Sequence, residues 1–286
     1  MISQGMGELE VRELREGGVG QTCLLIAAWR AKEAEQIDPL FVDPMANIFI
    51  SPAMESWVDQ VTRASVSTFH LISCRTRYFD DCLKSEMERG LKQVVLLGAG
   101  LDTRSLRLGN PAVSFYEIDQ GEVLLYKRQC LEGNGYSVRS HLIEGDYIQD
   151  DLLAMLESRG FRANEETYFI WEGNTMYIPG NAILSFLNRL KAGVPRFRIS
   201  FDYLSEQLIQ QNTGFEGAVN LINGFAEMGA PWVTGFADIQ QVAVPTSLTV
   251  LENKWVAEVV EPSHLRETLS RDLFRHYSVC TLSSCE

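Results

Sequence analysis

The chain has 286 residues, a hydrophobic content of 45%, a mean hydropathy of -0.07 and a formal net charge of -13. These values are typical of a globular protein, and no stretch approaches the roughly 20 apolar residues that a membrane helix needs. The negative charge would repel a phosphate backbone, and no basic run offsets it, so nucleic acid is not an expected partner.

The first ten residues lack the basic start and the apolar stretch of a secretory signal, which favours a cytoplasmic protein. The cysteines are scattered without a Cys-x-x-Cys pair, at Cys23, Cys74, Cys82, Cys130, Cys280 and Cys285. This spacing predicts neither a zinc site nor a disulfide framework. We therefore expect reduced, mostly buried thiols and no bound metal.

Residues 1–90 have helical character. The segment 22–34 has apolar residues at helical spacing without Gly or Pro, and Asp38-Pro39 and Asp43-Pro44 then punctuate the chain. A second helix is predicted over 70–89, ending at Gly90, a residue typical of helix C-termini. We interpret residues 1–90 as an N-terminal helical cap that belongs to the same domain as the rest.

From residue 91 onward the pattern alternates between strand and helix. Strands are predicted near 94–97, 113–118, 140–144, 167–172 and 196–202, with helices over 120–132, 150–158 and 181–191. The alternation predicts an α/β fold with a doubly wound, Rossmann-like, mostly parallel sheet over residues 91–286.

The region after the fifth strand is harder to assign. We interpret residues 205–235 as an insertion that helps form a substrate pocket, since insertions at the carboxyl ends of parallel strands lie where ligands bind. Further along we expect a helix within 236–251, a strand over 255–260 and an apolar segment near 277–282.

The most informative segment is the run 94–104, Val-Val-Leu-Leu-Gly-Ala-Gly-Leu-Asp-Thr-Arg. A buried strand that opens through Gly98 and Gly100 into a helix lets the backbone approach a ligand closely. Glu117 and Asp119 end the next strand, where a carboxylate can accept hydrogen bonds from ribose hydroxyls. The pattern predicts an adenosine-containing cofactor, although a tight turn without a ligand is an alternative interpretation.

The same turn discriminates between cofactors. A dinucleotide fingerprint needs a third small residue where this chain has Thr103, and Asp102 places a negative charge where a pyrophosphate would lie. S-adenosylmethionine carries no phosphate, and its amino group could be attracted by the Asp102 carboxylate. The segment therefore favours S-adenosylmethionine over a nicotinamide dinucleotide.

At this point the chain resembles the leucine carboxyl methyltransferase-like family of class I S-adenosylmethionine-dependent methyltransferases. The resemblance rests on blocks that keep the family order, at 22–33, 41–46, 75–81, 97–104, 116–119, 145–147 and 171–179. It spans about residues 20–205 and becomes faint after Asp202-Tyr203.

The resemblance implies roles for the donor side of the site. Arg75 would bind the methionine carboxylate, because a guanidinium matches a carboxylate in a two-pronged geometry, with Arg77 as the fallback. The alternative for Arg77 is a solvated helix-face charge paired with Asp80 or Asp81. Gly98 and Gly100 would form the cofactor turn. Asp119 would hold the ribose, with Glu117 as the alternate.

Two further positions complete this set. Asp146 and Tyr147 resemble the adenine-contacting pair, with a helix cap before Asp150 as the alternative interpretation of Asp146. Glu172 resembles the family acid at the reactive end of the cofactor, and without that role it would be an unpaired carboxylate beside an apolar core.

The acceptor side is less readable. Family members that methylate protein use a lysine near the first helix, and residues 22–28 contain none, while Lys32 lies far along that helix. This departure favours the bacterial branch, whose members often methylate small natural products. His70 and His141 are candidate bases with a structural role as the more common alternative. Aromatic candidates for an apolar pocket are Trp57, Phe69, Tyr177, Tyr203, Phe215, Phe225 and Trp232.

The resulting hypothesis is an S-adenosylmethionine-dependent O-methyltransferase that acts on a carboxylate or hydroxyl of a small molecule, such as a polyketide or peptide-type intermediate. The alternatives are a protein C-terminal carboxyl methyltransferase, a nicotinamide-dependent oxidoreductase and a non-catalytic binding protein. No catalytic base and no oligomeric state are assigned from the sequence.

Overall fold

The computed structural model describes residues 18–214, 216–260 and 275–285. Within them a seven-stranded sheet has the order β3-β2-β1-β4-β5-β7-β6. The strands are β1 (Gln93–Leu97), β2 (Ser114–Asp119), β3 (His141–Glu144), β4 (Thr167–Trp171), β5 (Phe197–Leu204), β6 (Thr249–Trp255) and β7 (Tyr277–Ser283). Strands β1 to β5 pair in parallel, and β7 is antiparallel to both β5 and β6. The predicted doubly wound, mostly parallel fold is confirmed.

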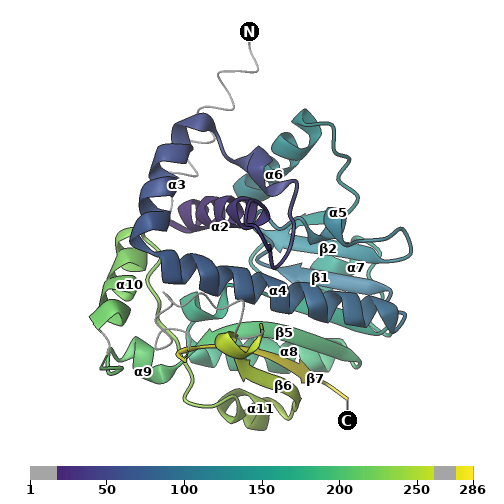
Figure 1. Ribbon diagram of the computed structural model, residues 1–286. Helices are drawn as coiled ribbons and strands as arrows, with labels where there is room; N and C mark the ends of the chain where they lie inside the picture. The colour runs from purple at the N-terminus through teal and green to yellow at the C-terminus, as the bar shows by residue number, and fades with distance from the viewer. Residues whose placement is uncertain (1–17, 215, 261–274, 286) are drawn as a thin grey trace.

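Helices cover both faces of this sheet (Figure 1). On one face α4 (Val66–Glu88) places Tyr78, Phe79 and Leu83 against the strand residues Val94 and Leu96. The opposite face packs against α7 (Leu152–Glu157), α8 (Gly180–Gly193) and α11 (Gln240–Thr246). Strand β1 is buried along its whole length, and after Gln93 its sequence is entirely apolar, as is typical of a central parallel strand.

The described part of the predicted N-terminal cap is helical. It comprises α2 (Gly18–Ala34), the 3-10 helix η1 (Ala46–Phe49), α3 (Pro52–Ala64) and α4, with α2 and α3 at one end of the sheet in Figure 1. The sequence interpretation missed α3, although Pro52 at its first turn is a helix-start signal. Helix α4 packs directly on one face of the sheet, so it is part of the same core as the strands.

The remaining helices before β6 lie in the connections between strands. They are α5 (Arg104–Arg107), α6 (Gly121–Gly133), η2 (Thr175–Tyr177), and, after β5, α9 (Glu206–Ile209) and α10 (Glu216–Glu227). The predicted strand over 255–260 is wrong, because Trp255 ends β6 and Val256–Glu258 form the 3-10 helix η3. The backbone N–H of Trp255 donates to the Glu258 carboxylate at 2.8 Å, which stabilises the turn in place of an extended chain.

The structure bears on the expectations for the cysteines and for membrane helices. All six cysteines are free, but only Cys74 and Cys280 are buried, so the expectation of mostly buried thiols is wrong. Across the described ranges, no helix combines the length and apolarity needed to cross a membrane.

The strand order places a topological switch point beside β1. The chain passes from β1 to β2 and β3 on one side, and then crosses to β4 on the other side. Ligands bind at the carboxyl ends of strands at such a point, because the connections diverge and leave a crevice. The glycine turn after β1 and Glu172 after β4 border this crevice.

Candidate functional site

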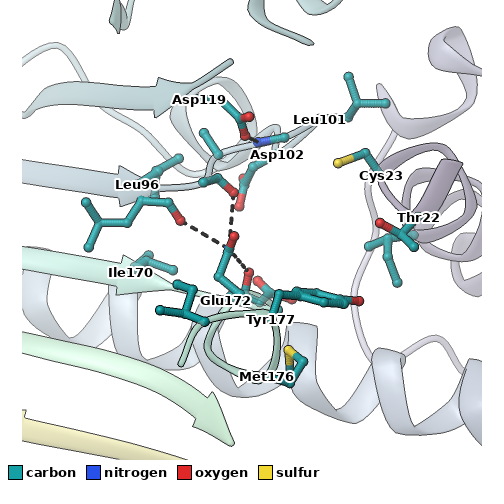
Figure 2. Close-up of a pocket in the computed structure, with 18 of the residues that line it drawn as sticks. Thr22, Cys23, Leu96, Leu101, Asp102, Asp119, Ile170, Glu172, Met176 and Tyr177 are labelled. Atoms are coloured by element: carbon teal, nitrogen blue, oxygen red, sulfur yellow. Dashed lines mark hydrogen bonds between the residues drawn. The ribbon is translucent and has the colours of Figure 1, made fainter. Parts of the chain in front are cut away.

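A cavity of about 640 Å³ lies at the switch point. Residues proposed from the sequence for the cofactor site line it together: Arg75, Gly98, Gly100, Asp102, Asp119, Asp146, Tyr147 and Glu172. Figure 2 shows Asp102, Asp119 and Glu172 at the strand ends, with Thr22 and Cys23 facing the same space from α2. Glu117 does not line it.

The glycine turn needs both of its glycines. Gly98 and Gly100 have φ angles of +61° and +49°, in the left-handed region where a side chain is strained. A Cβ on Gly98 would lie 2.3 Å from Oδ1 of Asn174. The backbone N–H of Gly100 donates to Oδ2 of Asp119 at 2.6 Å. The turn and the end of β2 are therefore held as one unit.

The two acids of β2 have different surroundings. Asp119 lines the cavity, and its Oδ1 also accepts from the N–H of Gln120 at 2.7 Å. Burial raises the pKa of Asp119, against the lowering effect of these N–H groups. Glu117 is fully buried within the strand, where it pairs with Lys127 of α6 and accepts from Ser105 Oγ at 2.6 Å. Only Asp119 is positioned to meet a ligand.

Arg75 is buried and already has carboxylate partners. Its Nε lies 2.9 Å from Glu172 Oε1, and its Nη1 lies 2.9 Å from the Tyr277 hydroxyl and 3.4 Å from Asp202 Oδ2. Burial alone would lower the pKa of Arg75, but its acidic and phenolic neighbours raise it above the usual value. Nη2 is the one guanidinium nitrogen of Arg75 for which the described residues provide no hydrogen-bond partner. This nitrogen is therefore available to a ligand.

The fallback residue Arg77 lies outside the cavity lining. Its Nε pairs with Asp81 at 2.6 Å on the exposed surface, and its Nη1 donates to the backbone oxygen of Leu40 at 2.9 Å. This is the solvated helix-face arrangement, with Asp81 as the partner. The other expected partner, Asp80, instead binds Arg104 and Arg107 in the interior.

Glu172 was expected to be unpaired if it had no role at the cofactor, but the protein itself supplies two partners. Its Oε2 lies 2.6 Å from Arg104 Nη1, while Oε1 binds Arg75. Arg104 is itself buried, with Nε 2.7 Å from Asp80 Oδ1 and a further ion pair to Asp102. Burial would raise the pKa of Asp102, but Arg104 and Arg30 hold it well below its usual range. Sequence reasoning gave no role to Arg104, although it ends the glycine-turn motif.

Asp146 and Tyr147 both line the cavity after β3. Asp146 Oδ1 accepts from the N–H of Ile148 at 2.9 Å and of Gln149 at 3.2 Å, so it also stabilises the turn. The cap of α7 is Asp151, which accepts from Ala154 N at 3.1 Å. The Tyr147 hydroxyl accepts from Trp171 Nε1 at 3.0 Å, and burial raises the pKa of Tyr147.

The cavity has two chemically different halves. We call the stretch lined by 98–102, 119–122 and 144–148 the strand-end half. The helical half is lined by apolar side chains from α2, α4 and the segment after β5, namely Ile26, Leu71, Ile72, Leu221, Phe225 and Trp232. The rings of Phe225 and Trp232 stack with centroids 4.5 Å apart.

The aromatic and histidine candidates separate clearly. Tyr177, Phe225 and Trp232 line the cavity, whereas Trp57, Phe69 and Tyr203 do not, and Phe215 lies outside the described residues. His70 packs on Phe69, and the ring of His141 stacks on that of Tyr116 with centroids 4.9 Å apart. Neither histidine lines the cavity. The described chain holds no cluster of side chains suited to a metal ion.

Three further residues at the site had no assigned role from the sequence. Asn174 donates from Nδ2 to the Glu172 backbone oxygen at 2.7 Å and lies against the glycine turn. Asp202 within β5 accepts from the N–H of Gly173 at 2.6 Å, and Tyr277 begins β7. Asn174 was within a family block, so its position was a usable signal; Tyr277 had none.

Comparison with known proteins adds a family and a fold. The family described as Leucine carboxyl methyltransferase matches residues 23–191. A protein of Mycobacterium sp. (strain KMS), named as a putative S-adenosyl-L-methionine-dependent methyltransferase, is 33% identical over 257 residues, covering 80% of this chain and 85% of that protein.

Two more comparisons have narrower scope. A putative S-adenosyl-L-methionine-dependent methyltransferase of Mycolicibacterium smegmatis is 37% identical over 176 residues, which is 57% of this chain and only 59% of that protein. The crystal structure of a putative methyltransferase from Thermobifida fusca YX has a TM-score of 0.60 at 14% identity, and covers 83% of this chain and 92% of that one. At this identity the structural likeness shows the fold alone.

Proposed function

The chain belongs to the leucine carboxyl methyltransferase family, and from this premise we propose that it is an S-adenosylmethionine-dependent O-methyltransferase. Its substrate is a small molecule, methylated at a carboxylate or hydroxyl, of the polyketide or peptide type found among natural products. The names of the mycobacterial relatives support the cofactor, and the cavity's dimensions suit a cofactor with a small acceptor.

One observation carries the choice of cofactor. The N–H of Arg104, at the start of the helix after the glycine turn, donates to Asp102 Oδ1 at 2.6 Å. In dinucleotide-binding folds such helix-start amides face the pyrophosphate. Here a carboxylate already occupies that position, and the third-glycine position is Thr103, whose hydroxyl donates to buried Asp43 at 2.7 Å. The turn therefore suits a cofactor without phosphate.

The remaining residues fit the parts of S-adenosylmethionine. Asp119 has lone pairs left for ribose hydroxyls, Asp146 and Tyr147 border the adenine end, and Nη2 of Arg75 would hold the carboxylate. The carboxylates of the cavity lining, Asp102 and Glu172 among them, outnumber its cations Arg30 and Arg75, and this balance suits a sulfonium and an ammonium.

The cofactor, when bound, supplies an electrophilic methyl group to an acceptor oxygen. The chain's own contribution is to position that oxygen in line and to exclude water, which the apolar helical half would do. An ionised carboxylate acceptor would need no base, whereas a hydroxyl would need a group to receive its proton.

Calorimetry with S-adenosylhomocysteine tests the proposal directly. We expect one site per chain with an affinity in the micromolar range, and a thermal shift with this ligand but none with NAD(H). A folded sample that binds NAD(H) and not S-adenosylhomocysteine would falsify the assignment. Production of S-adenosylhomocysteine from the methyl donor and a metabolite extract would then separate an enzyme from a non-catalytic binding protein.

A further inference from the structure

The charge of the cavity lining bears on the acceptor. Carboxylates in the lining are Asp102, Asp119, Glu122, Glu144, Asp146 and Glu172. The cations of the lining, Arg30 and Arg75, are already paired, with Asp43 at 2.9 Å and with Glu172 at 2.9 Å. Arg104, outside the lining, pairs with Asp102 and Glu172. The other four carboxylates have no ion pair among the described residues, so the lining is still net negative, and Nη2 of Arg75 is assigned above to the cofactor. An anionic acceptor would therefore meet no unpaired cation among the described side chains of the lining.

The helical half favours a flat apolar molecule. It is lined by aliphatic side chains of α2 and α4 together with the stacked rings of Phe225 and Trp232. Aromatic faces pack best on other rings, and such contacts add to the gain from burying apolar area. A compact ring system would fill this half with little loss of conformational freedom.

Tyr277 joins this half to the reactive end of the cavity. Its ring belongs to the same apolar cluster as Leu71 and Ile72, while its hydroxyl is at hydrogen-bond distance from Arg75. Because β7 runs antiparallel to β5, Tyr277 at the start of β7 pairs with Leu204 at the end of β5. The phenol of Tyr277 is thus brought to the carboxyl edge of the sheet, where Arg75 connects it to Glu172 and Asp202 connects it to Gly173.

The hydroxyl of Tyr277 has a defined direction. It donates to Oδ2 of Asp202 and accepts from Nη1 of Arg75 at 2.9 Å, which leaves one lone pair of the phenolic oxygen. Asp202 is completely buried and also accepts from the N–H of Gly173. A donor in the cavity could hydrogen-bond to Tyr277, and Tyr277 is connected to a buried carboxylate.

We propose that the acceptor is an uncharged, flat, hydroxyl-bearing molecule whose O–H donates to Tyr277, and that the Tyr277–Asp202 pair receives its proton during transfer. This inference rests on the proposed methyltransferase function and selects the hydroxyl from its two acceptor classes.

The step balances without a further reagent. The acceptor oxygen forms a bond to the methyl carbon as the carbon–sulfur bond breaks, and that bond's electron pair cancels the sulfonium charge. The acceptor proton moves to Tyr277 Oη as the phenolic proton of Tyr277 moves to Asp202 Oδ2. Burial raises the pKa of Tyr277 well above its usual value, so the phenol passes a proton on and does not remain ionised. Burial likewise raises the pKa of Asp202, despite the opposing effect of Arg75, which suits a proton acceptor.

A matched pair of probes tests the acceptor class. Naphthol and naphthoate, substituted at the same ring position, are titrated at neutral pH into the full chain saturated with S-adenosylhomocysteine. We expect naphthol to bind at least about tenfold more tightly than naphthoate. Equal or tighter binding of naphthoate overturns the inference, and so does binding of neither. If S-adenosylhomocysteine itself fails to bind, the proposed function fails before this comparison is reached.

The Tyr277→Phe variant tests the proton path. With S-adenosylmethionine as donor and naphthol as acceptor, we expect the unmodified chain to form methoxynaphthalene. In Tyr277→Phe we expect kcat for this reaction to fall about a hundredfold or more, while KM changes far less. Methoxynaphthalene has no O–H to donate, so its own affinity should be the same in the variant and in the unmodified chain. Retained S-adenosylhomocysteine binding shows that the variant is folded.

A control and a second variant complete the test. Tyr203→Phe removes a phenol of β5 that contacts Asn253 outside the cavity, and we expect unchanged kcat. Asp202→Asn should lower kcat as Tyr277→Phe does, with a combined variant no slower than either alone, since both act in one path. Unchanged kcat in Tyr277→Phe, additive losses in the combined variant, or absence of product from bound naphthol would each overturn the proton path.

Discussion

The two halves of the cavity are built in opposite ways. The strand-end half consists of backbone turns and charged side chains that directly follow β1, β2 and β3, and it is fixed by buried ion pairs and hydrogen bonds. The helical half consists of apolar side chains from α2, α4, α10 and the segment after α10, which are far apart in the chain. Directional contacts should make the first half sensitive to single changes, whereas non-directional packing should make the second tolerant.

Removal of Arg104 should give the largest effect on the strand-end half. Arg104→Met keeps the length of the side chain but leaves Asp80, Asp102 and Glu172 without their shared partner. An uncompensated buried charge costs about 3–5 kcal/mol, so the free energy of unfolding should fall by about that amount. Urea unfolding measures it. Arg77→Met, at an exposed ion pair, is the control and should cost about 0–1 kcal/mol.

If Arg104→Met were as stable as the control, the ion pairs would not hold this half in place. The strand-end half would then depend on packing, as the helical half does, and the contrast between the halves would be lost.

Gly98→Ala should give the next largest effect. The substitution adds about 1–2 kcal/mol of backbone strain, because the residue has a left-handed conformation. Its Cβ would also lie 2.3 Å from Oδ1 of Asn174 and would displace that side chain. We expect a stability loss of about 2–3 kcal/mol and at least tenfold weaker S-adenosylhomocysteine binding. Gly90→Ala also places a side chain at positive φ, +91°, but meets no neighbouring atom within 4 Å. Equal losses in the two variants would show that the close approach to Asn174 contributes nothing.

The variants Asp119→Asn and Glu117→Gln show which acid of β2 contributes to cofactor affinity. An amide cannot accept with both of its ends, so one contact to Gly100 or Gln120 is lost along with the charge. We expect S-adenosylhomocysteine binding about tenfold weaker, or about 1.4 kcal/mol, by calorimetry. Glu117→Gln should lower stability through Lys127 while leaving the dissociation constant within about twofold. The reverse pattern would assign the ribose to Glu117.

The difference between the halves also explains what sequence could predict. The five parallel strands and the glycine turn were predictable, because buried runs, Gly98, Gly100 and the acid at Asp119 are local signals. However, Asp119 and Glu117 are only two residues apart, and their spacing from the glycine turn does not show which of them faces a ligand. The partners that decide between them, Lys127 and Ser105, are on the following and preceding helices.

Long-range pairings limited the prediction elsewhere. Arg75 was identified, but not its partners Asp202 and Tyr277, which lie 127 and 202 positions away along the chain. The strand expected over 255–260 failed because a run of apolar residues does not distinguish an extended chain from the 3-10 turn that the Glu258 carboxylate stabilises. Only the antiparallel return of β7 brings Tyr277 to the site.

Trp232→Leu should give the smallest effect on the cofactor and tests the tolerance of the helical half. Loss of the stack on Phe225 should cost about 0.5–1.5 kcal/mol of stability, because a leucine fills part of the volume without the ring contact. S-adenosylhomocysteine affinity should stay within about twofold, while naphthol binding to the loaded protein weakens about fivefold. Trp57→Leu, at a half-buried ring outside the cavity, should change neither affinity. If Trp232→Leu instead weakened the cofactor as much as Asp119→Asn does, the two halves would be one coupled site, since distant and independent contacts do not affect each other's affinity.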